Sequence, residues 1–594
     1  MYRKISLLIA FLGFSSLTNA TLWVGGDANC DYSSIQPALN EMMAGNETHL
    51  YIANNNVFNG VYNENLTYNN TQTELIRIKG GYDHCEGDVT DVNTEINGGG
   101  FAPVFNISGN DNSTGMRISN LNITNGAYDA FQYSGGLNII DNQLSIDLTR
   151  VIISNNQGYH GGGIFSGGGT GLVIRLYETL VTNNNAEFGG GIYCLGNKIS
   201  MYGESGIANN SASSTDQARG MGGGIYMEDG CDFLMSAGDL EAASLAGITG
   251  NSATGHGGGT FVNDGSLLRL TQAVEGLGHV VYKDNMADFD NDGFGNGGAV
   301  YLSGLYSNLV AERQGVIIKN NSAVNGGALA LANDSQANIK SASRCSMNTP
   351  CIVFSGNTAG QNTDAIGTGR GGVFHVNDAY LKVSRSSITD SHADFGVVGY
   401  AENSGVIDMD FDLIHNNGRT PDANFDQNNL FVNFSGGLKL THVTVVDNIL
   451  SASEAMVLGI NNAYVLVNNS ILQALGNQTF DGITSSGTNL DLSFKCNVMH
   501  EVVSIGASSS EIRDNTQTTT PGFINSAEQN YRLSAGSISV DKCNEYITTP
   551  LDQLDLEGRL TGVDDPTKTN VLGTYDAGAS ESYQWDVIFE DGFE

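Results

Sequence analysis

Residues 152–164 read IISNNQGYHGGGI, and copies of this pattern decide the fold of the chain. An apolar residue stands three positions before an Asn, a short polar stretch follows, and Gly-Gly then precedes further apolar residues. Successive copies lie roughly 25 to 45 residues apart, within the range of solenoid repeats. The apolar residue and the Asn of each copy are Ile152 and Asn155, Leu180 and Asn183, Ile207 and Asn210, Ile248 and Asn251, Tyr282 and Asn285, Ile317 and Asn320, and Phe354 and Asn357, with weaker copies at Ile388, Leu413 and Val445.

Between these markers lie short runs of Val, Ile, Leu and Tyr, such as residues 172–176 and 463–467, which are typical of short strands. Such strands bury their apolar side chains only when each one stacks on the next coil. The Asn residues predict hydrogen-bonded ladders at the bends, and Gly-Gly predicts positive φ or close backbone approach. A β-propeller or sandwich would need a series of Asn-Gly or Asp-Gly hairpins, which we do not find.

The pattern therefore predicts an all-β fold, a right-handed parallel β-helix. At roughly 25 residues per coil, residues 50–510 would make about 18 coils, and a strand spacing of about 4.8 Å gives a rod of about 90 Å. Residues 33–45 carry apolar side chains at helical spacing after Ser33-Ser34 and end at Gly45. We expect them to form an amphipathic helix that caps the first coil.

The first twenty residues are typical of a signal peptide, because Arg3 and Lys4 precede an apolar run and small residues end at Ala20. We expect the mature chain to begin at Thr21 and to contain no transmembrane segment. It would comprise the β-helix with its cap over 21–520, a C-terminal closing region over 521–580 and a short acidic tail over 581–594. The tail is interpreted either as a sorting signal or as a disordered end.

The chain has eight cysteines, an even number that favours disulfides in an exported protein. Spacing does not determine which cysteines pair. Because neighbouring coils of a solenoid meet locally, we favour sequential pairs, which are Cys30 with Cys85, Cys194 with Cys231, Cys345 with Cys351, and Cys496 with Cys543.

The net charge is −37, from 63 acidic and 26 basic residues. Such a surface repels nucleic acid and anionic lipid, repels acidic polysaccharide unless cations bridge the two, and favours divalent cations. We therefore expect no nucleic-acid partner. A polysaccharide or a surface protein is the expected partner, and the oligomeric state is left open.

Three segments carry a resemblance to a known superfamily. Residues 31–39 (DYSSIQPAL) resemble a Y-x-T-I-Q-x-A entry motif, residues 60–65 (GVYNEN) resemble a following G-x-Y-x-E-x strand, and residues 465–471 resemble a late coil. Together they resemble the pectin-lyase-like β-helix superfamily, and the Gly-Gly repeats are similar to those of polymorphic outer-membrane proteins.

The C-terminal motifs resemble the closing region of bacterial choice-of-anchor Q surface proteins; they are residues 521–525, 530–533, 555–559 and 574–579. Both resemblances imply a parallel β-helix that is exported to the extracellular space or the cell surface. They do not imply a particular activity.

The superfamily includes pectate lyases, polygalacturonases and pectin methylesterases, so an enzyme has to be considered. Asn362-Thr363-Asp364, Gly255-His256-Gly257 and Arg77-Ile78-Lys79 resemble pieces of a polygalacturonase site, which needs paired carboxylates. Here the pieces run in reverse order and many coils apart. A lyase would need acids clustered near an Arg, and none is evident beside Arg370 or Arg385. We favour adhesion or glycan or protein binding without catalytic residues, with a polysaccharide lyase or hydrolase as the alternative.

Residues 288–293 read DFDNDG, which matches the start of a calcium-binding loop. In such a loop Asp288, Asp290 and Asp292 converge on one hard cation while Gly293 allows the sharp turn. The twelfth position is Ala299, where an EF-hand has a bidentate Glu, and no helices flank the motif. The motif therefore predicts either a weaker calcium loop or an acidic solvated insertion.

Overall fold

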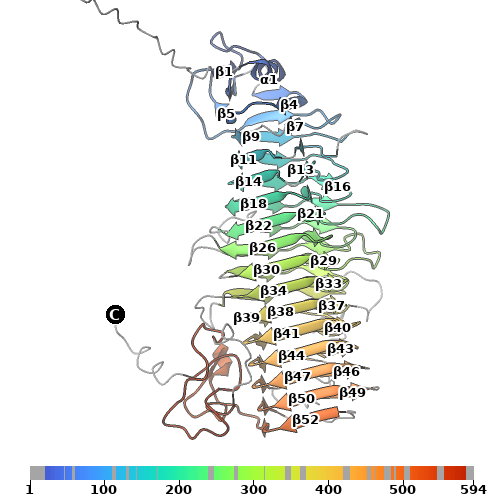
Figure 1. The fold of residues 1–594 in the computed structure, drawn as a ribbon, viewed down its shortest axis with the longest axis vertical. Coiled ribbons are helices and arrows are strands. Elements are labelled where there is room, and N and C mark those ends of the chain that lie inside the picture. Colours follow the sequence, from blue (N-terminus) through green and yellow to red (C-terminus); the bar gives the residue numbers. More distant parts are fainter. Residues whose placement is uncertain are drawn as a thin grey trace, which may run out of the picture.

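A computed structural model shows a rod-shaped parallel β-solenoid (Figure 1). It describes residues 21–582 except 46, 56–59, 110–114, 129–132, 142, 170, 238–246, 273–278, 313–314, 342–349, 361–368, 419–428, 451–455, 461, 474–482, 487–489, 501–508 and 545–553. The signal peptide expected over 1–20 and most of the expected tail lie outside the described residues.

Each coil passes through three long sheets in the same order. In one coil, β13 (Ile164–Gly167) belongs to a 14-stranded sheet, β14 (Val173–Tyr177) to a 17-stranded sheet and β15 (Leu180–Thr182) to a 16-stranded sheet. A corner sheet of six two-residue strands, from β16 (Asn185–Ala186) to β36 (Thr358–Ala359), leads back to the 14-stranded sheet. Every strand of these sheets pairs in parallel with its equivalent in the next coil.

The interior of the rod is filled by alternate side chains of every strand. In β14, Ile174 and Leu176 point inward and lie in register with Ile199 and Met201 of β18 (Lys198–Gly203). The 17-stranded sheet extends from β1 (Thr21–Val24) to β52 (Ser509–Arg513), and at about 4.8 Å per strand it is about 80 Å long. The predicted parallel β-solenoid is therefore confirmed.

A ladder of buried Asn side chains follows the 16-stranded sheet along the rod. From the second rung onward, each Oδ1 accepts hydrogen bonds from the backbone N–H and the Nδ2–H of the preceding Asn, at 2.9–3.1 Å. In the first rung, Asn156 Oδ1 accepts from the Gly126 N–H at 2.8 Å. Each Nδ2 also donates to a backbone carbonyl, as Asn251 does to Ile207 at 2.9 Å. The seven rungs are Asn156, Asn184, Asn210, Asn251, Asn285, Asn321 and Asn357.

At three rungs, the Asn that the sequence pattern selects is the residue before the Asn that forms the ladder. Asn155, Asn183 and Asn320 are exposed, have φ of 55–56°, and stand immediately before the rung. Where two Asn residues are adjacent, the first adopts the left-handed turn that Asn tolerates, and the second turns inward.

The Gly-Gly pairs show both predicted features: the first glycine has a positive φ, and the second allows close backbone approach. Gly161 has a φ of 67°, a conformation that favours glycine. At Gly162 a Cβ would lie 2.5 Å from the carbonyl oxygens of Asn185 and Gly190 in the next coil, so no side chain fits. The pair thus lets one coil lie directly on the next at this corner.

The N-terminal end of the rod is capped by α1 (Ile35–Ala44), which confirms the predicted helix. Ile35, Ala38, Leu39 and Met42 are buried against the first coil. The carboxylate of Glu64 accepts hydrogen bonds from the free N–H groups of Ile35 and Gln36, at 2.8 and 2.9 Å. Glu64 therefore satisfies helix donors that Ser34 leaves without a side-chain cap.

Three of the four predicted disulfides are present, joining Cys30 to Cys85, Cys194 to Cys231 and Cys496 to Cys543. The fourth prediction involves Cys345, which lies outside the described residues. Three disulfides indicate an oxidising environment, as expected for an exported protein. In the described part of the chain, no helix is long and apolar enough to cross a membrane.

Residues 521–582 fold back along the side of the last coils (Figure 1). They include a short antiparallel pair, β54 (Phe523–Asn525) and β55 (Asn530–Leu533), joined by η1 (Ser526–Glu528). The Gly578 N–H donates to the Asn469 carbonyl at 2.7 Å, and the Ala579 N–H to Thr444 Oγ1 at 2.9 Å. This C-terminal segment thus covers the outer side of the 16-stranded sheet in the last coils.

We predict that Asn251→Ala destabilises the chain by about 2–4 kcal/mol, because it leaves buried donors of Asn210 and the Ile207 carbonyl without partners. Urea unfolding followed by circular dichroism measures the loss. Asn63→Ala is the matched control, since Asn63 is exposed at the end of β3 (Val61–Asn63). Equal stability of the two variants would show that the ladder does not contribute.

Candidate functional site

The acids of the DFDNDG motif lie in an insertion at one corner of the rod. The insertion, residues 288–295, connects β28 (Met286–Ala287) of the corner sheet to β29 (Val300–Ser303) of the 14-stranded sheet. Positive φ angles at Asp288, Asn291 and Gly293, of 63°, 58° and 83°, curl the chain. The structure therefore places the motif on a tight loop, as the sequence predicts.

The loop brings the three carboxylates together, with one oxygen of each within 4.8 Å of the others. Asp288 Oδ1 accepts hydrogen bonds from the N–H groups of Gly293 and Phe294, at 3.1 and 3.4 Å. Asp288 Oδ2 is buried and has no hydrogen-bond partner. Burial raises the pKa of Asp288 to about 6, and burial and the Asp292 charge raise the pKa of Asp290.

Ala299, at the twelfth position of the motif, lies in the core and continues the backbone ladder between coils. It offers no ligand, in agreement with the exclusion of an EF-hand. A cation in this loop would be held by three carboxylates, with water completing its coordination. Calcium tolerates such flexible oxygen coordination, whereas magnesium demands near-ideal octahedral geometry.

The same corner borders a continuous band of aromatic side chains, here called the aromatic face. Five rings lie in one column on the outside of the 14-stranded sheet, with Tyr226 stacked between Tyr193 and Phe261 at 5.1 and 4.9 Å. A second column stands just before the Gly-Gly corners and packs beside the first. The first column is Phe165, Tyr193, Tyr226, Phe261 and Tyr301. The second is Tyr133, His160, Phe188 and His256, with Met221 in place of a ring between Phe188 and His256.

Farther along this sheet lies a polar cluster that the sequence analysis missed. Glu402 accepts hydrogen bonds from Arg370 at 3.2 Å and pairs with His375 at 3.0 Å. The Arg370 guanidinium lies over the Tyr400 ring, 5.1 Å from its centre. Hydrogen bonding to His375 lowers the pKa of Glu402. A single acid, Glu402 of the next coil, therefore lies beside Arg370, where the sequence shows no evident cluster of acids.

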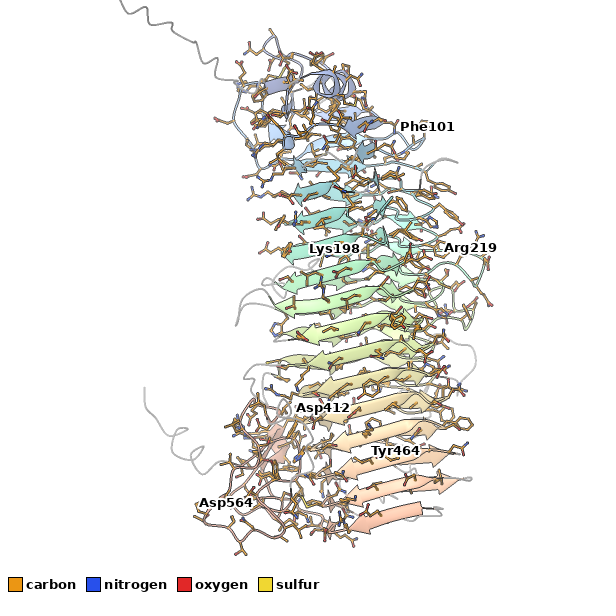
Figure 2. All side chains as sticks on the ribbon, viewed as in Figure 1. Phe101, Lys198, Arg219, Asp412, Tyr464 and Asp564 are labelled. Atoms are coloured by element: carbon orange, nitrogen blue, oxygen red, sulfur yellow. A yellow bond between two sulfur atoms is a disulfide. The ribbon has the colours of Figure 1, made fainter. Side chains whose placement is uncertain are left out.

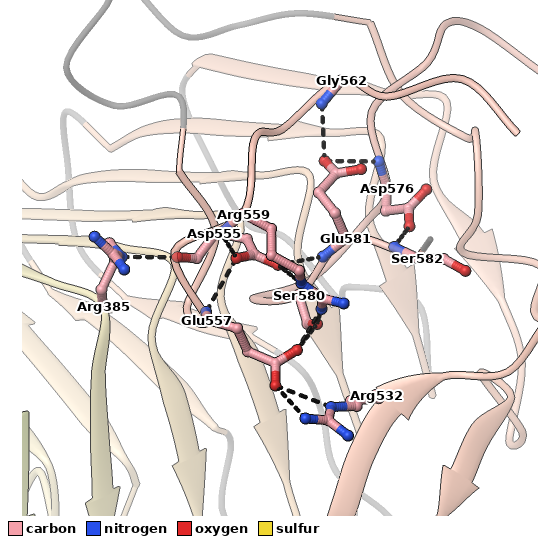
Figure 3. Close-up of polar contacts among 10 residues, drawn as sticks. All are labelled: Arg385, Arg532, Asp555, Glu557, Arg559, Gly562, Asp576, Ser580, Glu581 and Ser582. Atoms are coloured by element: carbon pink, nitrogen blue, oxygen red, sulfur yellow. Dashed lines mark hydrogen bonds and ion pairs between the residues drawn. The ribbon is translucent and has the colours of Figure 1, made fainter. Parts of the chain in front are cut away.

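A second group of titratable residues is buried in the C-terminal segment (Figure 3). Asp555 and Glu557 pair with Arg559, and Glu557 also pairs with Arg532. The fully buried Arg385 of the rod donates to the Asp555 carbonyl at 2.7 Å. The ion pairs hold the segment together, and the Arg385 hydrogen bond joins it to the rod.

Asp576 and Glu581 are buried nearby and are bonded only to backbone N–H groups in the described part of the structure. Burial raises the pKa of Asp576 to about 7, and burial together with the Asp576 charge raises that of Glu581. Perturbed acids often mark active sites. Here both side chains are enclosed by their own segment, so we interpret them as structural.

The two polygalacturonase-like fragments that the structure describes lie far apart. Arg77 and Lys79 lie on β5 (Ile76–Tyr82) near the N-terminal end, whereas His256 is buried at a corner several coils away. His256 Nδ1 accepts a hydrogen bond from the Asn296 N–H at 3.1 Å, and burial lowers its pKa to about 4. Asp364 lies outside the described residues.

A scan against protein-family models and a search of curated proteins found no match to this chain.

We predict that the C-terminal segment loosens as the pH rises. Asp576 has a folded-state pKa of about 7, above its usual value of 3.8, so the stability it contributes is complete below about pH 4 and is lost by about pH 7. His442, buried beneath the segment, has its pKa lowered to about 3 and acts in the opposite direction between about pH 3 and 6.5. The test therefore compares variants rather than the native chain alone.

Hydrogen exchange of residues 530–582 between pH 4 and 8 measures this loosening. Asp576→Asn, which cannot ionise, should reduce the pH dependence. Asp564→Asn is the control, because Asp564 is an exposed acid of the same segment (Figure 2). An unchanged pH dependence in Asp576→Asn would contradict the prediction.

Proposed function

We propose that this chain is an exported, right-handed β-helix of the pectin-lyase-like superfamily that acts at the cell surface by binding a polysaccharide. The opening motifs and the choice-of-anchor Q-like C-terminal motifs support the family and the location. Right-handed connections are the rule between parallel strands of one sheet. The three disulfides support export.

The aromatic face is the observation that carries the proposed binding function. Its columns run along the rod. Four rings of the first column are only 3–7% exposed, so a polymer lying on the face would contact chiefly the second column and the exposed Tyr side chains beside it. At the N-terminal end of the face, Tyr133 is 42% exposed. Beside the two columns lie Tyr128, which is 43% exposed, and Tyr159, which is partly exposed and contacts the His160 ring. Exposed Tyr side chains offer an apolar ring and a polar hydroxyl, which suit a sugar ring and its hydroxyl groups.

Polar pairs border the aromatic rings of this face. Arg219 pairs with Glu187 at 2.8 Å and lies 6.0 Å from the centre of the Tyr159 ring. Arg370 is placed in the same way beside Glu402 and Tyr400. Because each Arg is paired with a carboxylate, these groups suit hydroxyl groups better than a strong anion. With a net charge of −37, the ligand that fits best is a neutral polysaccharide.

The Arg370, His375 and Glu402 cluster is what favours the alternative, a lyase or hydrolase. The cluster contains one carboxylate, whereas glycoside hydrolysis normally uses two. The pKa of Glu402 is lowered, so this carboxylate stays charged and is not suited to donate a proton. Binding without turnover is therefore the function that this geometry supports better.

We predict that the mature chain binds a neutral polysaccharide saturably and releases no product. Tyr133→Ala or Tyr159→Ala should weaken binding about three- to tenfold, because each removes one aromatic contact. Calorimetry against a panel of neutral and acidic polysaccharides measures affinity, and reducing-end and ultraviolet assays detect cleavage.

Tyr177→Ala is the matched control for these variants. Its ring stacks on Tyr202 at 5.0 Å, on the outside of the 17-stranded sheet. Product release that is lost in His375→Ala would establish the enzyme instead. Equal weakening by Tyr177→Ala would show that the ligand does not lie on the aromatic face.

A further inference from the structure

One carboxylate oxygen of the buried Asp288 side chain has no hydrogen-bond donor. The side chain is 0% exposed, and the two N–H groups that reach it both donate to Oδ1. Oδ2 has no hydrogen-bond donor. Burying a carboxylate oxygen without a partner destabilises the folded state. A bound proton or a bound cation would remove this penalty.

The neighbours of Asp288 favour a cation. Oxygens of Asp290 and Asp292 approach the same point as its carboxylate, which places three acidic groups within 4.8 Å. Both of these neighbours are exposed, so an ion can enter from solvent. Converging carboxylates repel one another until a hard cation is bound, and alternate Asp residues before a Gly are a common calcium arrangement.

The loop is connected to a second insertion of the same corner, residues 213–220. Gln217 Nε2 donates to Asp292 Oδ2 at 3.0 Å, across 75 residues of sequence. Backbone hydrogen bonds also connect these coils. The Gly255 N–H donates to the Gly220 carbonyl at 2.8 Å, and the Asp288 N–H donates to the Gly255 carbonyl at 3.4 Å. An ion that fixes Asp292 would therefore also restrain the neighbouring insertion.

We propose that Asp288, Asp290 and Asp292 bind one calcium ion, and that through Gln217 this ion fastens the 213–220 insertion to the 288–295 loop. The site has no bidentate Glu and leaves positions for water, so its affinity falls in the range of extracellular calcium modules, with Kd of about 0.1–1 mM. Magnesium binds more weakly, because three carboxylates on a flexible loop do not supply its strict octahedral geometry.

Calorimetry of the full mature chain, freed of metal with a chelator, tests the site with calcium chloride and magnesium chloride as probes. The expected result is one calcium per chain, with at least tenfold weaker binding in Asp290→Asn and Asp292→Asn. Asp229→Asn is the matched control, because Asp229 is an exposed acid in the turn after β21 (Ile225–Glu228) and also has a positive φ. Circular dichroism verifies that each variant is folded.

Limited trypsin cleavage at Arg219 tests the connection between the insertions. The Arg219 side chain is 42% exposed and lies on the outer side of the corner (Figure 2). Calcium should slow this cleavage in the native chain and in Asp229→Asn, but not in Asp290→Asn. Gln217→Ala should retain calcium binding and lose the protection of Arg219.

Two results would overturn the site: no calcium binding by the native chain, or binding that is unchanged in both Asp290→Asn and Asp292→Asn. Full protection of Arg219 in Gln217→Ala would overturn the connection while leaving the site in place. None of these outcomes depends on whether the chain binds a polysaccharide.

Discussion

Hydrogen bonding from each coil to the next is the constraint on which the rest of this structure depends. A strand in a solenoid has no partner within its own coil, so its N–H and C=O groups must be met by the equivalent strands above and below. The strands can meet this requirement only if the corners of successive coils lie directly above one another. The Asn ladder fixes one corner by filling it with side-chain hydrogen bonds, and the Gly-Gly pairs fix another by removing side chains from the contact.

Between the fixed corners the length of the chain is free to vary. Residues 213–220 and 288–295 both bulge from the same corner, yet the strands that flank them stay in register. The clustered acids and the edge of the aromatic face therefore lie on or beside that corner. A solenoid can change its binding surface by altering these bulges without disturbing its core.

The sequence predicted what depends on neighbouring residues or on the next coil. The alternation in β14, the helix α1 and the three disulfides are of this kind. So is the Asp288 loop, whose three acids lie within five residues of one another. The error at Asn155 and Asn183 has a simple cause: a pattern of letters does not distinguish an Asn that turns the chain from one that points inward.

Longer contacts could not be predicted in the same way. Arg370 and Glu402 are 32 residues apart in the chain, and because coil length varies, the sequence does not reveal which residues face each other. The contact between Arg385 and Asp555 spans 170 residues and involves a segment without any repeat. The position of this segment along the rod follows from tertiary packing and from hydrogen bonds to the rod rather than from periodicity.

The disulfide between Cys496 and Cys543 has a mechanical consequence. Tension applied to the chain beyond Ser582 passes along the C-terminal segment to Cys543 and then through the sulfur bridge directly into the rod at Cys496. Residues 497–542, which include β52 and the β54–β55 pair, lie in a loop outside this covalent path. A molecule held by its C-terminal end would therefore be pulled on an interior coil, and its terminal coil would be shielded from being peeled away.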